Sequence, residues 1–261
     1  RSSAASDVYK RQEVTTMGYQ LLANYEDLFD YTKSEHHSEY IFDIEYQSGI
    51  GEGSTFTTAF FPNFSEMNEF FNITGAGQEY NNPTQELISL FVPGDTRKEV
   101  TVGVPGGFYD ADSVFHALPT STNQTYTKKY FDSSPVRADS KANWKVIRYA
   151  DVLLMYAEAL NENGKPQQAI PFLNQVRTRA GLEGYPNTMS QTETRDAIVL
   201  ERRLELSFEG VRWFDLVRTG KAYEVMKDKG MAPYMTVFPI PLSQVQIIND
   251  PTIFPQNPGY D

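Results

Sequence analysis

The sequence predicts a mainly α-helical protein whose helix pairs support a long region of loops with little β structure. Apolar residues recur at helical spacing in residues 148–180, where Gly164 and Pro166 divide the segment into two helices. A further helix is indicated after Ser190. Residues 49–82, in contrast, are rich in Gly, Ser, Thr, Asn and Phe and lack a regular period, which is typical of a long loop region.

The two helices of residues 148–180 are expected to form an antiparallel pair. Gly164 suits the end of the first helix, and Pro166 suits the first turn of the second. The small residues Ala157 and Ala169 alternate with large apolar ones, a pattern that lets antiparallel helices pack closely, as in tetratricopeptide repeats. One such pair is weak evidence for a repeat by itself. The large apolar residues of this alternation are Leu153, Leu173 and Val176.

The helix after Ser190 has well-marked ends. Ser190 and Glu193 have the spacing of a capping box, and Gly210 follows the last apolar residue. A short helix is then predicted over Val211–Thr219. The chain continues into a proline-rich tail, where proline every few residues is expected to exclude regular helix. The tail prolines are Pro239, Pro241, Pro251, Pro255 and Pro258.

The part of the chain before residue 148 shows weaker signals. Residues 1–12 lack hydrophobic periodicity and are predicted to be a non-native or disordered lead, and residues 17–33 have the spacing of a helix or a helix plus turn. Residues 39–46 alternate as a strand, with Tyr40 and Phe42 on the face opposite Asp43. A short helix is predicted within residues 83–97, and a short strand near residues 126–131 in a loop-rich stretch.

Composition excludes several classes of function. The 261 residues are 40% hydrophobic, enough for a real core, and their net charge of -11 opposes binding to nucleic acid. The absence of cysteine removes disulfides, thiol nucleophiles and thiolate metal sites. No apolar run is long enough to span a bilayer. The 17 Phe and 16 Tyr invite a binding hypothesis, because rings stack on flat ligands, although most of them are expected in the core.

The signals for catalysis are weak. Glu201, Glu205 and Glu209 fall on one helical face and could supply the paired carboxylates of a glycosidase. Arginines at 202, 203 and 212 are interleaved with them, so ion pairing within a helix network explains the charges better. The adjacent His36 and His37 point in different directions and are assigned to a surface turn rather than a metal site. We expect no catalytic residue, no metal site and no cofactor.

Several blocks of the sequence resemble the SusD/RagB family. RYADVLLMYAEALN at residues 148–161 closely resembles the hallmark stretch of these proteins, and the other similar blocks follow in the family's order over most of the chain. Three looser matches lie upstream, at residues 19–29, 39–46 and 94–97. The clearer ones are ALNENG at 159–164, AIPFLNQVRTRAGL at 169–182, ERRLELSFEGVRWFDLVRTG at 201–220, FPIPLSQVQIIND at 238–250 and QNPGY at 256–260.

The resemblance implies a SusD-like fold, in which tetratricopeptide-like helix pairs support a looped, minor-β ligand-binding region. Family members are typically about twice this length, so residues 13–261 would be the C-terminal SusD/RagB-like domain without its N-terminal repeat half. The resemblance also implies a lipoprotein on the outer face of the outer membrane of a Bacteroidota-type bacterium. Its lipid anchor would be a cysteine outside this sequence, and its partner a SusC-like TonB-dependent transporter.

The ligand site is expected in the loop region of residues 49–82, because the blocks that resemble the family are mostly structural. Stacking rings would come from aromatic residues of this region, and hydrogen bonds to hydroxyls from its amide side chains. Both tryptophans, Trp144 and Trp213, are assigned to the core. The predicted ligand-binding residues are Phe61, Phe64, Phe71, Tyr80, Asn63, Gln78, Asn81 and Asn82.

The function implied is capture of an oligosaccharide or polysaccharide and its delivery to the transporter, without catalysis. Three alternatives stay open at this point. The RagB branch of the family implies capture of peptides or glycopeptides. A glycoside hydrolase would use Glu201 or Glu205, and would need them in an open cleft. A repeat scaffold that binds only protein would turn its loop aromatics inward.

Overall fold

The computed structural model describes residues 4–30, 32–33, 35–60, 62, 77–103, 107–109, 114–117, 125–130 and 138–260, with the backbone alone at 4–9 and 107–109. The chain forms two compact units, Arg1–Glu209 and Gly210–Asp261. No helix among these residues is both long enough and apolar enough to cross a membrane.

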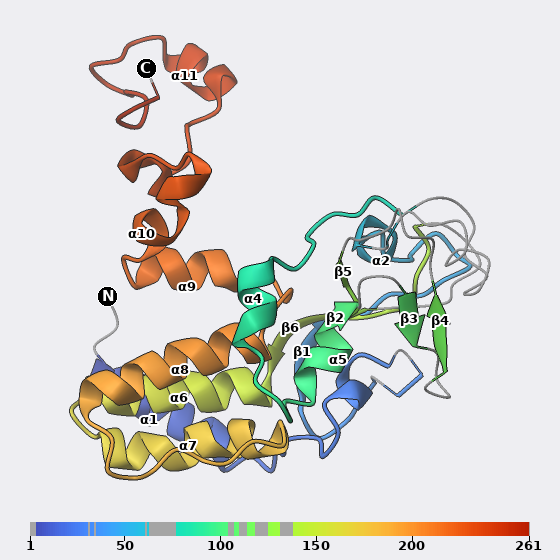
Figure 1. The fold of residues 1–261 in the computed structure, drawn as a ribbon. Helices are drawn as coiled ribbons and strands as arrows, with labels where there is room; N and C mark the ends of the chain where they lie inside the picture. The colour runs from blue at the N-terminus through green and yellow to red at the C-terminus, as the bar shows by residue number, and fades with distance from the viewer. Residues whose placement is uncertain are drawn as a thin grey trace. The chain divides into compact units, whose positions relative to one another are not determined.

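Helices form the scaffold of the first unit (Figure 1). α6 (Tyr149–Glu162) and α7 (Pro166–Arg179) are the predicted antiparallel pair, and α8 (Gln191–Glu205) packs against both of them. α1 (Ala4–Thr15) covers another side of α6. The mainly helical fold class and the helix pair are therefore confirmed.

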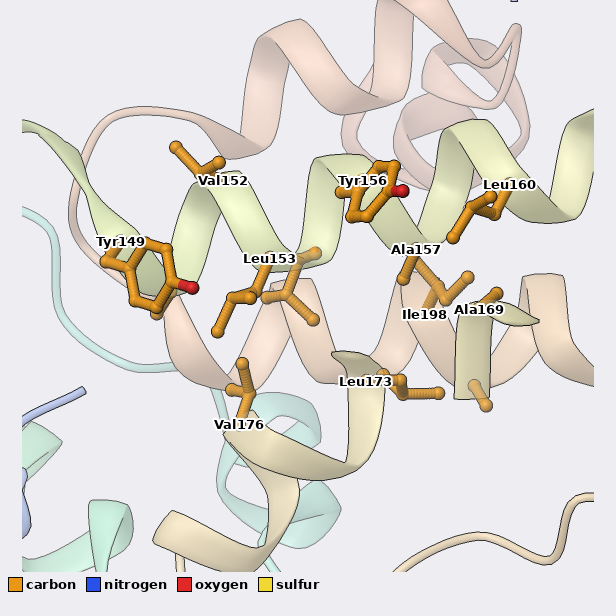
Figure 2. Close-up of a cluster of buried hydrophobic side chains, with 13 residues drawn as sticks. Tyr149, Val152, Leu153, Tyr156, Ala157, Leu160, Ala169, Leu173, Val176 and Ile198 are labelled. Carbon is orange, nitrogen blue, oxygen red and sulfur yellow. The ribbon is translucent and has the colours of Figure 1, made fainter. Parts of the chain in front are cut away.

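The core of this scaffold depends on small residues where α6 and α7 meet. Ala157 of α6 and Ala169 of α7 are completely buried, and Figure 2 shows Leu173 and Ile198 among the large side chains around them. A methyl group at each contact position allows the two helix backbones to approach closely, while the larger side chains fill the space on either side. The alternation of small and large residues in the sequence thus corresponds to the packing of α6 against α7.

Enlarging Ala157 should therefore disrupt the core. We expect Ala157→Leu to lower the free energy of unfolding by about 1–3 kcal/mol, because the extra atoms must displace α7. Urea denaturation measures the change. Gln168→Leu is the matched control, since Gln168 is exposed on α7 beside the buried Ala169. Equal effects of both substitutions would contradict close packing at Ala157.

α8 begins as the sequence predicted. The Ser190 side chain accepts a hydrogen bond from the Glu193 backbone N–H at 3.3 Å, and Glu193 Oε2 accepts one from the Ser190 backbone N–H at 2.8 Å. This capping box satisfies amide groups that the first turn of a helix leaves without partners. It fixes where α8 starts, and hence where the glutamates of its last turns lie.

The β structure is minor, as expected. Among the described residues it consists of three antiparallel two-stranded sheets, which gather with α2 (Phe56–Phe60) at one end of the helical scaffold (Figure 1). The strand pairs are β1 (Tyr40–Ile44) with β6 (Trp144–Arg148), β2 (Val102–Gly103) with β5 (Tyr126–Thr127), and β3 (Gly107–Tyr109) with β4 (Phe115–Ala117).

β1 is the predicted strand, but its charged residue faces inward. Asp43 is buried and pairs with Lys145 of β6, whereas Phe42 is 54% exposed and pairs across the sheet with Ile147. Register shifts on both sides of Phe42 disturb the simple alternation of the two faces. Sequence alternation therefore located the strand without showing which face is buried.

Other local elements differ in part from the predictions. The helix or helix plus turn predicted at residues 17–33 is wrong for most of this stretch, because η1 (Glu26–Leu28) is the only helical element among its described residues. Leu22 instead donates its backbone N–H to Glu39 Oε2 at 2.9 Å, which holds the chain in a non-helical path. α4 (Gln85–Leu90) is the predicted short helix and is followed by α5 (Arg97–Thr101).

Residues 4–12, within the predicted lead, form most of α1. Val14 of this helix packs against the buried cluster of α6, which explains why the helix forms despite its weak periodicity. That residues 1–12 are non-native stays a prediction, as does the domain boundary at residue 13.

The second unit consists of short helices. α9 (Arg212–Arg218) is the predicted helix. The expectation that the tail excludes helix is wrong for α11 (Leu242–Ile248), because Pro241 stands before this helix and Pro251 after it. The remaining elements are α10 (Ala222–Met226), η2 (Lys227–Lys229) and η3 (Pro233–Thr236).

Polar side chains near the C-terminus fasten the proline-rich segment of this unit. The Gln256 amide bonds both the N–H and the C=O of Ile240, at 2.7 and 2.8 Å. Asn257 Nδ2 donates to Phe238 O at 2.7 Å, and the Tyr260 hydroxyl donates to Val237 O at 2.9 Å. Side-chain amides thus provide the partners that a proline-containing backbone cannot find in a helix or sheet.

Candidate ligand-binding site

The predicted ligand-binding residues fall into two groups. Gln78, Tyr80, Asn81 and Asn82 are described by the structure, and their side chains are exposed on one short segment. Four others lie outside the described residues: Phe61, Asn63, Phe64 and Phe71. The assignment of all eight to a ligand site stays a prediction.

The segment of residues 77–82 is fixed from two sides through its backbone. Gln78 and Tyr80 donate their N–H groups to Thr58 O and Ala59 O of α2, at 3.1 and 2.8 Å. The Thr127 hydroxyl of β5 donates to Asn81 O at 2.6 Å. Because these contacts use the backbone, they do not occupy the exposed side chains of Gln78, Tyr80, Asn81 and Asn82.

The backbone of this segment is strained on either side of Tyr80. Glu79 and Asn81 have φ angles of 56° and 63°, in the left-handed region that residues other than glycine seldom adopt. The Tyr80 side chain between them is 60% exposed. Strain of this kind persists where surrounding contacts hold it in place and is common at binding sites. The turn presents an aromatic ring and three amides on a fixed backbone.

An aromatic cluster supports α2, on which the turn rests. Phe56 packs edge-on against both Tyr130 and Trp144, with ring centroids 5.2 Å apart in each case, and Tyr130 stacks on Trp144 at 5.1 Å. The Thr57 hydroxyl also donates to Tyr130 O at 3.0 Å. Trp144 is partly buried and packs against this cluster, and Trp213 is likewise partly buried in the second unit.

A buried network of charges joins this region to the helices. Arg148, at the junction of β6 and α6, binds three carboxylates from two segments. Its Nε and Nη2 atoms donate to the two oxygens of Glu209 at 2.8 and 2.9 Å, and Nη1 donates to Glu39 at 2.9 Å. Nη1 also bonds Glu205. The charge of this arginine is therefore fully compensated inside the protein.

The other arginines of the network come from different elements. Arg97, at the start of α5, binds Asp95 through Nε and Nη2 at 2.8 and 2.7 Å and also pairs with Glu201. Arg179, at the end of α7, pairs with Glu205 and with Glu39. The side chains of these residues are all less than 5% exposed. Five segments of the first unit thus meet at the end of α8.

Lys129 connects the network to the aromatic cluster. Its ammonium group donates to Glu209 at 2.9 Å and to the carbonyl of Ser207 at 2.7 Å, and it lies 4.7 Å from the centroid of the Phe29 ring. Burial lowers the pKa of Lys129 to about 8, with Glu209 opposing that shift. Tyr130, the next residue, is the ring that stacks on Trp144.

The geometry of the three glutamates does not suit glycosidase chemistry. Burial would raise the pKa of Glu205, but Arg179, Arg148 and Arg97 hold it well below its usual range. Glu201 and Glu205 are inaccessible to solvent and each pairs with arginine. A general acid must be protonated and in contact with substrate, and neither residue meets both conditions. They are structural, as the sequence predicted.

The sequence did not identify most partners of these glutamates. Arg202 and Arg203 pair elsewhere, with Asp151 and Glu86. Their arginine partners include Arg97, Arg148 and Arg179, which lie on other elements, and Lys129 is a further partner of Glu209. In the sequence, these arginines were marked only by their place in or beside the blocks that resemble the family. The order of acidic and basic residues along one helix does not indicate ion pairs with other elements, because the tertiary fold creates those contacts.

The described residues contain no group of three His, Asp or Glu side chains that could hold a metal ion. His36 is exposed, consistent with the predicted surface turn, whereas His37 is half-buried. Its Nδ1 atom accepts a hydrogen bond from the Glu39 backbone N–H at 3.2 Å. Burial, with Lys145 and Arg148 nearby, lowers the pKa of His37 to about 4.

Comparison with known proteins decides the family. The model of the SusD family matches residues 38–255. The chain belongs to the SusD family. SusD family proteins bind their ligands without catalysing a reaction, in agreement with the prediction that this chain is not an enzyme.

Among curated SusD-like relatives, protein P2 of Formosa agariphila is 26% identical over 262 residues, and the match covers 91% of this chain and 51% of P2. Protein P38 of the same organism is 36% identical over 156 residues, covering 57% of this chain and 28% of P38. This chain thus spans about half the length of P2, and its match to P38 covers a smaller share of that relative.

Solved SusD-like structures share the fold. A laminarin-binding SusD-like protein is 29% identical with a TM-score of 0.75, over 98% of this chain and 59% of that one. Surface glycan-binding protein A from Bacteroides thetaiotaomicron, solved with laminarihexaose, is 24% identical with a TM-score of 0.76, over 97% of this chain and 59% of that one. The predicted SusD-like fold is confirmed.

Proposed function

We propose that the protein is a non-catalytic, cell-surface glycan-binding protein that captures oligosaccharides and delivers them to a SusC-like TonB-dependent transporter. The observation that carries the proposal is the turn at Tyr80, where an exposed ring and the amides of Gln78, Asn81 and Asn82 stand on a fixed backbone. A ring that packs on the apolar face of a sugar, beside amides that bond its hydroxyls, is the usual chemistry of glycan recognition.

Laminarin is the first ligand to test. A similar structure that is 29% identical to this chain is a laminarin-binding SusD-like protein. Capture and transport need no turnover, in accord with the buried, paired state of Glu201 and Glu205. We further propose that the protein lies on the outer face of the outer membrane as a lipid-anchored protein and needs no cofactor.

Affinity electrophoresis in laminarin tests this function with the full-length protein. We expect laminarin to retard the wild type and Tyr80→Ala to weaken binding about tenfold, because the stacking surface and its burial are lost. Tyr223→Ala is the matched control, since this tyrosine is 39% exposed in the second unit. The control should bind as the wild type does.

A glycan array extends the test to other sugars. If a different polysaccharide retains the wild type but not Tyr80→Ala, the ligand is that polysaccharide rather than laminarin. The proposed function would then still hold. Binding to peptides with no retention by any glycan would overturn the proposal in favour of peptide capture. Circular dichroism of each variant shows whether a loss of binding reflects a loss of fold.

A further inference from the structure

A crevice on the helical scaffold has the features of a second ligand site. It lies in the first unit, has a volume of about 530 Å³, and is bounded by residues 19–23 together with the start of α6 and the end of α7. This volume falls within the range of about 300–1,000 Å³ that is typical of small-ligand pockets. The lining residues outside 19–23 are Tyr149, Gln175, Thr178 and Arg179.

Two tyrosines form an aromatic wall of the crevice. The rings of Tyr19 and Tyr149 lie 6.1 Å apart at an interplanar angle of 30°. Tyr149 is buried in the core of α6, so it holds Tyr19, which remains partly exposed. A partly exposed ring backed by a buried one offers a flat apolar surface of fixed orientation.

The strip of residues 19–23 is also fixed to the scaffold. Gln20 exchanges hydrogen bonds with Ser38, through its N–H at 3.0 Å and its carbonyl at 3.1 Å. Leu22 donates its N–H to Glu39 at 2.9 Å and accepts a bond from Arg179 at 3.5 Å. The crevice is therefore formed before any ligand arrives, which limits the ordering that binding requires.

The charges around the crevice disfavour an anionic ligand. Arg179 lines it, but its side chain is 4% exposed and pairs with both Glu39 and Glu205. That pairing leaves little positive charge for an anion, and the chain as a whole carries a net charge of -11. The exposed polar side chains at the rim are the amides of Gln20 and Gln175 and the hydroxyl of Thr178.

From this geometry we infer that the crevice between Tyr19, Tyr149 and the end of α7 is a second binding site for a neutral saccharide. One sugar ring packs on Tyr19, while the amides of Gln20 and Gln175 bond its hydroxyls. The inference draws its ligand class from the proposed function but does not use the turn at Tyr80. Two sites on one protein would allow a long chain to be held at both, which raises the effective affinity.

Methyl-resolved NMR of the full-length protein distinguishes the two sites. The methyl groups of Leu21, Ala23 and Thr178 report on the crevice, and those of Thr58 and Ala59 report on the turn at Tyr80. The probes are laminarihexaose, maltohexaose and cellohexaose. We expect at least one of them to shift the crevice signals saturably, and Tyr80→Ala to leave that shift unchanged.

Two variants test the crevice directly. Gln175→Ala removes one hydrogen-bonding group and should weaken binding there about fivefold. Ala23→Trp should abolish it, because Ala23 is exposed at the lining and a large ring obstructs the crevice. Both variants should leave the shifts of Thr58 and Ala59 unchanged.

The outcomes separate this inference from the proposed function. Shifts at the turn alone would overturn the crevice site and retain glycan capture. Shifts at the crevice alone would support it and refute the role of Tyr80. Absence of shifts at both sites with all three probes, or crevice shifts with peptides only, would overturn the inference.

Discussion

Replacing Arg148 by methionine is expected to lower the free energy of unfolding by about 3–5 kcal/mol. Arg148 donates to Glu39, Glu205 and Glu209, and the side chains of all three are no more than 3% exposed. Methionine fills part of the space but leaves these carboxylates without a shared cation. The cost of a buried, uncompensated charge is larger than the benefit of the original pair, so the loss should be severe. Urea denaturation at pH 7 measures it.

Arg195→Met is the matched control. Arg195 also binds one carboxylate through two nitrogens, at 2.7 Å each, but this pair with Glu162 is about 40% exposed on both sides. An exposed ion pair contributes at most about 1 kcal/mol, because water replaces the lost partner. Similar effects at Arg148 and Arg195 would show that burial does not set the strength of the network.

Replacing Glu205 by glutamine should have the second large effect, and it should change the dependence of stability on pH. The pKa of Glu205 is well below its ordinary value in the folded protein, so the folded carboxylate stays ionised as the pH falls. In the unfolded chain it binds a proton near pH 4.5. The stability that Glu205 contributes is therefore fully present above about pH 5.5 and is lost as the pH falls below that range.

For Glu205→Gln we expect a loss of about 3 kcal/mol or more at pH 7 and a shallower decline of stability between pH 6 and pH 4. Denaturation curves across this range measure both quantities. Glu162→Gln, at the exposed pair with Arg195, should change stability at pH 7 by less than about 1 kcal/mol. An unaltered pH slope in Glu205→Gln would mean that other carboxylates cause the acid sensitivity.

The helical scaffold could be predicted because its signals are local. Gly164 and Pro166 mark the ends of adjacent helices, and Ser190 with Glu193 marks the start of α8, each through contacts within a few residues. The β pairs could not be predicted in the same way. β6 runs into α6 with no glycine or proline between them, and its partner β1 lies about a hundred positions earlier.

Tertiary contacts also explain where local pattern failed. Tyr25, Leu28 and Phe29 have helical spacing because all three enter one aromatic cluster, yet only residues 26–28 form a helical turn. At the candidate site, composition indicated the loop and its amides. The left-handed backbone around Tyr80 and the contacts with α2 depend on the fold and left no pattern in the sequence.

The charge network also constrains the order in which the first unit can fold. Arg148 and Glu39 are 109 positions apart, and Arg97 and Glu205 are 108 positions apart. A partly folded chain that buried these arginines before residues 201–209 arrived would enclose incompletely compensated charge, because Asp95 and Glu39 alone would face Arg97, Arg148 and Arg179. Pairing at such separations is slow, because a long loop must close first. We therefore expect the network to become complete only when the last helix of the first unit is in place.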